Sequence, residues 1–485
     1  MSGILKGGRL SATRSDVVDF ISSLSADRRI ALSTVLVNEA HVIALARCGA
    51  IKGRAAQEIL KALRTLEKHE FGKRRAEDVH VLIEDSVTER TGQEVGGFMH
   101  LGKSRNDQVV TAIRMTLRGE MLSLAQLLLG FELSLVGLAR KYVTSAFPGY
   151  THLQPAQPIS FGHYIMANCF PLLRDSERLL EAYDRVNLSP MGAGALAGTS
   201  VPLDRTLTAR LLGFDGTVEA SLDAVGGRDF ALEALGVFAL TATDLSRISS
   251  DLVFYSSSEV GIINLPDEFA STSSIMPQKK NPDPLELIRA KCARVGSNFN
   301  AALTLMHGLT SGYNLDYQEL TPLLWESVDE LNSCLRILEA LMNRIKPAKG
   351  IAARDYLQFT AATEIANLLV RTENLPFRTA HQKVGLLVKS AMSQGKSFQQ
   401  MGQRDWEAAL GFQLDARTFR TIIRTIDLDN HLNAYRTAGS PNPRETRRLI
   451  ALADRRCREL AREQKRKSVS LEVSRRFLRR TIAAT

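Results

Sequence analysis

Residues 109–142 carry an apolar side chain at every third or fourth position, and this stripe constrains the fold more than any other feature of the sequence. At 1.5 Å per residue, the spacing predicts one helix on the order of 50 Å long. A helix of that length outgrows a single compact domain and needs packing partners along its whole length. The stripe consists of Val109, Ile113, Leu117, Met121, Leu124, Leu128, Phe131, Leu135, Leu138 and Tyr142.

Four further long helical patterns follow, near 160–186, 229–258, 284–308 and 323–345. Together with the first they predict an all-α fold built on an antiparallel bundle of about five long helices. A chain of 485 residues is too long for one simple core. We therefore expect three mainly helical domains. Their expected ranges are 1–105, 106–350 for the bundle, and 351–485 with a basic tail.

The chain has a net charge of +10, and most of the excess lies near its end. Residues 454–480 hold eleven Lys and Arg against four Asp and Glu, which accounts for seven of the ten excess charges. A basic tail can bind nucleic acid or an acidic partner, but it is more often a solvated helix end. Phe477 is the one aromatic residue there, too few for a base-stacking platform. Nucleic acid is therefore not the expected partner.

The five cysteines are scattered, odd in number and without metal-ligand spacing. They favour a cytoplasmic protein with reduced thiols, and they predict no metal site. We find neither a signal-peptide pattern nor a run of about 18 apolar residues, so neither secretion nor a membrane partner is expected.

The densest cluster of reactive side chains is STSSIMPQKKNPDPLE, residues 271–286. Pro277 and Pro282 favour a loop. A helix should then begin with Asp283 as N-cap and Glu286 at its third position, where backbone N–H groups attract an anion. Lys279 and Asn281, with Lys280 between them, are donors suited to carboxylates. The alternative is a solvated basic loop followed by an ordinary helix cap.

Two more polar clusters frame the long stripe. SRND, residues 104–107, should open the first long helix, where Arg105 can grip a carboxylate and Asn106 can donate a second bond. Alternatively, Asp107 caps the helix and pairs with Arg105. GYTHLQPAQP, residues 149–158, should be irregular because of its prolines, and it surrounds His152 with polar groups such as Thr151. A lone histidine in such a segment is otherwise usually structural.

These motifs resemble the fumarase/aspartase superfamily, and the QKK version of the loop resembles its argininosuccinate lyases, the family that includes the δ-crystallins. The resemblance runs from about residue 6 to 445. It implies a homotetramer on a shared helical core with sites at subunit junctions, acting on a small-molecule substrate. The sequence contains no metal, nucleotide or flavin motif, so neither a cofactor nor a metal is expected. The resemblance also implies substrate contacts by Ser23, Arg105, Asn106, Thr151, Asn281, Tyr313 and Gln318, the last two holding the arginine end.

The chain departs from the family pattern at several of these motifs. Leu101 and Lys103 stand where the family has Thr and Arg, and Thr272 stands in place of Gly. Gly226 and Gly227 replace Ser and Asp in SLDAVGGRD, residues 221–229. In GYNLDYQELT, residues 312–321, the family has Thr at the first position, Leu at the sixth and Lys at the last. A substrate carboxylate that this lysine would hold therefore needs another partner, or has none.

The expected reaction is the elimination of fumarate from argininosuccinate to give L-arginine. Splitting this carbon–nitrogen bond needs a base for the Cβ proton, donors for the dianionic carboxylate, and an acid for the leaving nitrogen. Ser273 is the candidate base, with its alkoxide stabilised by Lys279, and His152, oriented by Glu286, is the candidate acid. The two roles could be reversed. Another superfamily lyase, or a non-catalytic crystallin-like protein on this fold, remain the alternatives.

Overall fold

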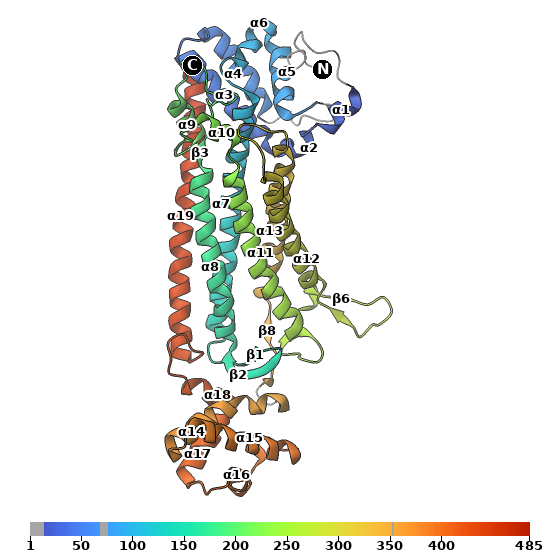
Figure 1. The fold of residues 1–485 in the computed structure, drawn as a ribbon, viewed down its shortest axis with the longest axis vertical. Helices are drawn as coiled ribbons and strands as arrows, with labels where there is room; N and C mark the ends of the chain where they lie inside the picture. The colour runs from blue at the N-terminus through green and yellow to red at the C-terminus, as the bar shows by residue number, and fades with distance from the viewer. Residues whose placement is uncertain (1–13, 68–75, 352–353) are drawn as a thin grey trace.

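Five long helices form the central body of the molecule in a computed structural model, which describes residues 14–67, 76–351 and 354–485 (Figure 1). They run alongside one another through the middle of the molecule, as the sequence predicted, and the predicted all-α fold class is confirmed. The five are α7 (Arg105–Lys141), α8 (Phe161–Val186), α11 (Asp229–Ser256), α12 (Asp283–Met306) and α13 (Tyr317–Met342).

Helix α7 begins where the SRND motif predicted. Ser104 is the N-cap, and its hydroxyl accepts the backbone N–H of Asn106 at 3.2 Å. Asp107 returns a bond to the backbone N–H of Ser104 at 3.0 Å and also accepts the N–H groups of Gly192 and Gly194. The fully buried Asp107 therefore fixes both the helix start and the glycine-rich turn beside it. The capping by Asp107 is thus confirmed, but its predicted pairing with Arg105 is wrong, because Arg105 pairs with Asp78.

Helix α19 (Pro443–Ala484) is a sixth long member of this body, and at 42 residues it exceeds the 37 of α7, the helix that the apolar stripe predicts. It runs back along α7 and α8 (Figure 1). Two of its basic residues pair with acidic groups on α8: Arg456 with Glu177, and Lys467 with Asp184. Much of the basic tail is thus one face of a packed helix.

Residues 361–426 form a separate hydrophobic cluster around Trp406 at the end of the molecule opposite the N-terminal helices. The expected domain limits stay a prediction. Within the expected C-terminal domain, α19 packs into the main hydrophobic cluster of the molecule, whereas residues 361–426 form their own cluster. The helices here are α14 (Ala362–Glu373), α15 (Phe377–Ser393), α16 (Gln403–Leu410), α17 (Ala416–Ile426) and α18 (Leu428–His431). Those before α7 are α1 (Ser15–Phe20), α2 (Leu24–Asp27), α3 (Ala31–Arg47), α4 (Gly53–Leu66), α5 (Val79–Thr91) and α6 (Gln93–Gly96).

Short hairpins interrupt the helices where the sequence predicted irregular chain. Residues 149–158 lie in an antiparallel hairpin of β1 (Ala146–Thr151) and β2 (Gln154–Ser160), because an isolated two-stranded sheet has edges on which prolines need no ladder partner. A second hairpin, β6 (Ser271–Thr272) with β7 (Lys280–Asn281), carries the loop 273–279. Elsewhere lie β3 (Leu188–Ser189) with β4 (Gly216–Thr217), β5 (Ile263–Asn264) with β8 (Lys346–Pro347), α9 (Arg205–Leu212) and α10 (Ser221–Gly226).

The predicted cap of α12 is wrong by one residue. The helix begins at Asp283 with Pro282 as its N-cap, and the Asp283 carboxylate accepts the Ser271 hydroxyl across the base of the hairpin. Glu286 therefore lies one position beyond the third helical residue and closes no capping box. Its carboxylate is exposed and free for another role.

Two helical segments, Leu24–Arg47 and Arg105–Lys141, are long and apolar enough to cross a membrane by length and composition alone. The relevant windows are 67% and 61% buried inside the molecule, which is the usual state of core helices. This is weak evidence for a membrane span.

Candidate functional site

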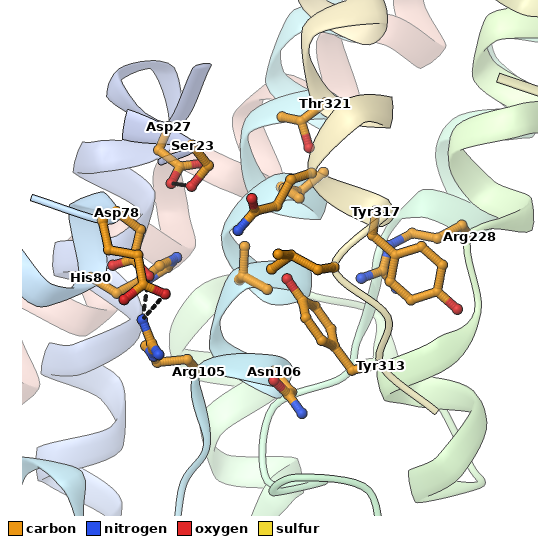
Figure 2. A pocket seen from close by; sticks show the side chains of 15 residues that line it. Ser23, Asp27, Asp78, His80, Arg105, Asn106, Arg228, Tyr313, Tyr317 and Thr321 are labelled. Atoms are coloured by element: carbon orange, nitrogen blue, oxygen red, sulfur yellow. Dashed lines mark hydrogen bonds and ion pairs between the residues drawn. The ribbon is translucent and has the colours of Figure 1, made fainter. Parts of the chain in front are cut away.

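A pocket near the N-terminal end of the bundle gathers residues from α2, α5, α7 and α13 (Figure 2). Five of the residues assigned by resemblance to substrate binding line it together: Ser23, Arg105, Asn106, Tyr313 and Gln318. The other lining residues are Asp27, Glu77, Asp78, His80, Val109, Ile113, Arg228, Leu315, Tyr317 and Thr321. Segments nearly 300 residues apart in the sequence therefore meet at one cavity.

One side of the pocket is acidic. The Ser23 hydroxyl donates to Asp27 at 2.5 Å, and Arg105 donates to Asp78 at 2.6 Å with Glu77 at 3.5 Å (Figure 2). Burial raises the pKa of Asp27 to about 6, against the opposing effect of the Ser23 hydrogen bond. This side can hold a cation such as a guanidinium or ammonium group when Asp27 is ionised.

His80 also lines the pocket, and the sequence reasoning did not single it out as a site residue. It is 4% exposed, neither ring nitrogen has a hydrogen-bond partner, and burial lowers its pKa to about 4. A neutral imidazole with unused nitrogens is suited to a hydrogen bond with a bound ligand. Its sequence signal is the string EDVH, residues 77–80, but acidic turns before helices are common, so this string alone does not indicate a site.

Lys103 and Leu101 depart from the family pattern, and neither lines the pocket. Lys103 is buried, and its ammonium group donates to the side chain of Asn38 rather than lining the pocket. Burial lowers its pKa to about 8. The carbonyl oxygen of Leu101 pairs with His41 Nε2 at 2.9 Å. Both positions therefore contact α3 and do not line the pocket.

The loop that carries Ser273 projects from the side of the bundle (Figure 1). The Ser273 hydroxyl oxygen accepts the backbone N–H groups of Ile275 at 3.2 Å and Met276 at 3.1 Å. Lys279 is exposed and Asn281 half-buried, while Ile275 leaves 86% of its surface exposed. In the single chain this turn therefore leaves an isoleucine and a lysine exposed to solvent.

His152 and Thr151 lie at the tip of the β1–β2 hairpin, exposed to solvent. His152 and Leu153 have φ of 55° and 59°, the left-handed region that a two-residue hairpin turn demands and that non-glycine residues rarely adopt. Such strain commonly persists at functional sites. Across the parts of the chain that the structure describes, no hydrogen bond or ion pair joins His152 to Glu286, so their pairing stays a prediction.

Within one chain the pocket is far from both the His152 hairpin and the Ser273 loop. The hairpin of His152 follows the end of α7, whose 37 residues span roughly 55 Å from the pocket at its start. The Ser273 loop precedes α12, whose 24 residues span roughly 36 Å before the chain reaches Tyr313. One chain cannot bring them onto one small substrate, whereas antiparallel association of long helices from several chains can.

A family model described as "Lyase" matches residues 9–296, and one described as "Argininosuccinate lyase C-terminal" matches 359–428. The crystal structure of EDDS lyase in complex with formate superposes with a TM-score of 0.88 at 28% identity, covering 98% of this chain and 96% of that one. A class II fumarase from Schistosoma mansoni shares the fold at a TM-score of 0.70 and 18% identity, covering 83% and 91%. Fold and motifs thus define a lyase of the fumarase/aspartase superfamily.

The sequence relatives narrow the class. Argininosuccinate lyase from Methanosarcina mazei is 39% identical over 460 residues, which cover 93% of this chain and 92% of that protein. The enzyme from Methanothrix thermoacetophila is 41% identical over 455 residues, 92% of each. The chain belongs to the argininosuccinate lyase family.

Proposed function

We propose that this lyase eliminates fumarate from argininosuccinate and releases L-arginine, at sites assembled from more than one subunit of a cytoplasmic homotetramer. The observation that carries the proposal is the pocket in which Ser23, Arg105, Asn106, Tyr313 and Gln318 converge, on a chain of this family. Its acidic side suits the cationic guanidinium group of the substrate. The five cysteines form no disulfide, which is in keeping with a cytoplasmic compartment.

In the proposed reaction, Ser273 removes a proton from the succinyl Cβ and the C–N electron pair leaves with the guanidinium nitrogen. The electrons of the broken C–H bond form the double bond of fumarate, and His152 returns a proton to the departing nitrogen. Lys279, Asn281, Arg105 and Asn106 are the groups that would stabilise the carboxylate charge as it builds. Thr151 would touch substrate beside His152.

Association into a tetramer is supported by apolar side chains left exposed along the bundle. Leu240 on α11, Leu287 and Leu303 on α12, and Ile337 on α13 each expose between 41% and 58% of their surface. Aligned on long helices, such residues favour a partner of the same kind. The same association would carry the Ser273 loop of one chain to the pocket of another.

The direct test is to mix purified protein with argininosuccinate and follow fumarate absorbance. Release of fumarate and arginine in equal amounts is expected. If the protein instead turns over another succinyl adduct of an amine but not argininosuccinate, it is a different lyase of the superfamily. Absence of turnover on either would leave the crystallin-like alternative.

The pH dependence of arginine binding tests the acidic side of the pocket. The pKa of Asp27 is raised to about 6 by burial, so the carboxylate is charged above that pH and neutral below it. If it holds the arginine cation, the Kd of L-arginine should rise about tenfold between pH 8 and pH 5, because the ionised fraction falls by that factor. Titration calorimetry on the Asp27→Asn variant is the control, which should bind weakly at both pH values. A flat pH dependence in the unmodified protein would exclude Asp27 from the contact.

A further inference from the structure

Arg228 is a buried cation with unused hydrogen-bonding capacity in the wall of the pocket. It is 3% exposed, and its Nη1 donates to the backbone oxygens of Val225 at 2.8 Å and Gly227 at 2.9 Å. Its Nε and Nη2 have no partner. A buried guanidinium with two unpaired nitrogens carries a desolvation penalty that an incoming anion would remove.

The position of Arg228 also separates it from the acidic side. Its guanidinium carbon lies 4.1 Å from the centre of the Tyr317 ring. Figure 2 shows this pair on the side of the pocket opposite Asp27 and Asp78, with the guanidinium directed along the tyrosine toward the middle of the cavity. A ligand with a cation at one end and a carboxylate at the other would meet a matching charge at each end.

The residues around Arg228 are those at which this chain departs from the family pattern. Gly226 packs so closely on Gly312 that a Cβ atom there would lie 3.0 Å from the Gly312 carbonyl oxygen. Gly312 itself has φ of 91°, where a β-branched residue would be strained. Tyr317, the ring under Arg228, donates its hydroxyl to the Gly312 carbonyl at 3.1 Å. In this chain residues 226–228 and 312–317 therefore lie together, and the arginine lies on the Tyr317 ring.

Thr321 is another position near Arg228 at which this chain departs from the family pattern. It is 5% exposed, lines the same pocket, and stands where the family has a lysine. The pocket therefore loses a cation at position 321, while Arg228 presents one with two free nitrogens. We propose that Arg228 binds the α-carboxylate of the arginine end of the substrate and so makes the site specific for an α-amino acid rather than a decarboxylated amine. This inference rests on the proposed function for the identity of the substrate.

The test compares L-arginine with agmatine, which lacks only the carboxylate. The unmodified protein should bind L-arginine at least about tenfold more tightly, as expected for a charge-assisted hydrogen bond to a carboxylate. In Arg228→Gln that preference should disappear, with agmatine binding little changed. Arg210→Gln removes an exposed arginine that lies over Phe477, outside the pocket, and is the matched control. It should keep the full preference.

A kinetic arm separates direct contact from a structural effect. With argininosuccinate, Arg228→Gln should raise KM at least about tenfold while kcat falls much less, and with succinylagmatine both constants should stay near those of the unmodified protein. Adding Thr321→Lys to Arg228→Gln should restore the preference for the carboxylate. If Arg228→Gln does not fold, the same comparison is made on Arg228→Lys. This variant keeps the positive charge but cannot bind a carboxylate through two nitrogens, so a reduced preference for L-arginine over agmatine is expected.

An unchanged arginine-to-agmatine ratio in the Arg228 variants would overturn the inference even if argininosuccinate is cleaved. Conversely, an intact Arg228-dependent preference in a protein that does not release fumarate would refute the proposed function and leave the carboxylate contact standing.

Discussion

Ser273→Ala is expected to lower kcat by roughly 10²- to 10⁴-fold, the range that a positioned general base contributes. The hydroxyl is the group proposed to take the Cβ proton, and an alanine cannot. In the present structure its oxygen only accepts two backbone N–H groups within an exposed loop, so its removal should cost the fold little. The measurement is single-turnover fumarate release, with the melting temperature and the sedimentation coefficient as controls.

The neighbouring Ser274→Ala is the matched control for that experiment, since it removes a hydroxyl from the same exposed loop. It is expected to keep most of the activity. Turnover by Ser273→Ala close to that of the unmodified protein would mean that Ser273 is not the base, and His152 would then be the better candidate.

Glu286→Gln should lower the rate by about 10²-fold or more if Glu286 orients His152 in the assembled protein. Since a carboxylate beside a histidine raises the histidine pKa, its loss should also move the limb of the pH–rate profile governed by His152 to lower pH. That is the alkaline limb if His152 is the acid and the acid limb if it is the base. The readout is fumarate release against pH for the variant and the unmodified protein.

A purely structural role for Glu286 predicts a different outcome. Its side chain closes no capping box, and a charge in the first turn of α12 stabilises the helix by at most about 1 kcal/mol. With only that role, Glu286→Gln should leave the rate and its pH profile nearly unchanged. An unchanged profile would leave His152 without its proposed partner. Glu319→Gln in the first turn of α13 provides a control for the general effect of removing such a charge.

The long helices could be predicted because burial of a continuous apolar stripe leaves a periodic record. The residues Leu117, Leu128 and Leu135 of α7 are all completely buried. Helix α19 was missed as a bundle member because its many charged residues mask a narrow apolar face that includes Ile450 and Leu460. Ion pairs to α8 stabilise this packing, and a partner on another helix leaves no local signal in the sequence.

The candidate site could be predicted only in part. Motif resemblance assigned roles to Ser23, Arg105 and Tyr313, and these lie together, but no local pattern shows that the loop of Ser273 is tens of ångströms from them in the same chain. The contribution of Arg228 was also hidden, because the absence of a hydrogen-bond partner is a property of the folded structure. Backbone strain at His152 similarly depends on the hairpin that formed.

The most direct test of the shared site is subunit complementation between two inactive variants. Ser273→Ala lacks the proposed base, and Asn106→Ala lacks a pocket residue whose amide donates to the Ala195 carbonyl at 3.2 Å. The two proteins are denatured, mixed and refolded, and each is refolded alone as a control. Sedimentation should show tetramers in every sample.

If each site takes its pocket from one subunit and its Ser273 loop from another, random assortment gives about one site in four with both parts intact. The mixed sample should therefore regain up to about a quarter of the activity of the unmodified protein, while each variant alone stays inactive. Activity in the mixture no higher than in the separate variants, with tetramers formed, would mean that the pocket and the loop act within a single chain and would contradict the shared site.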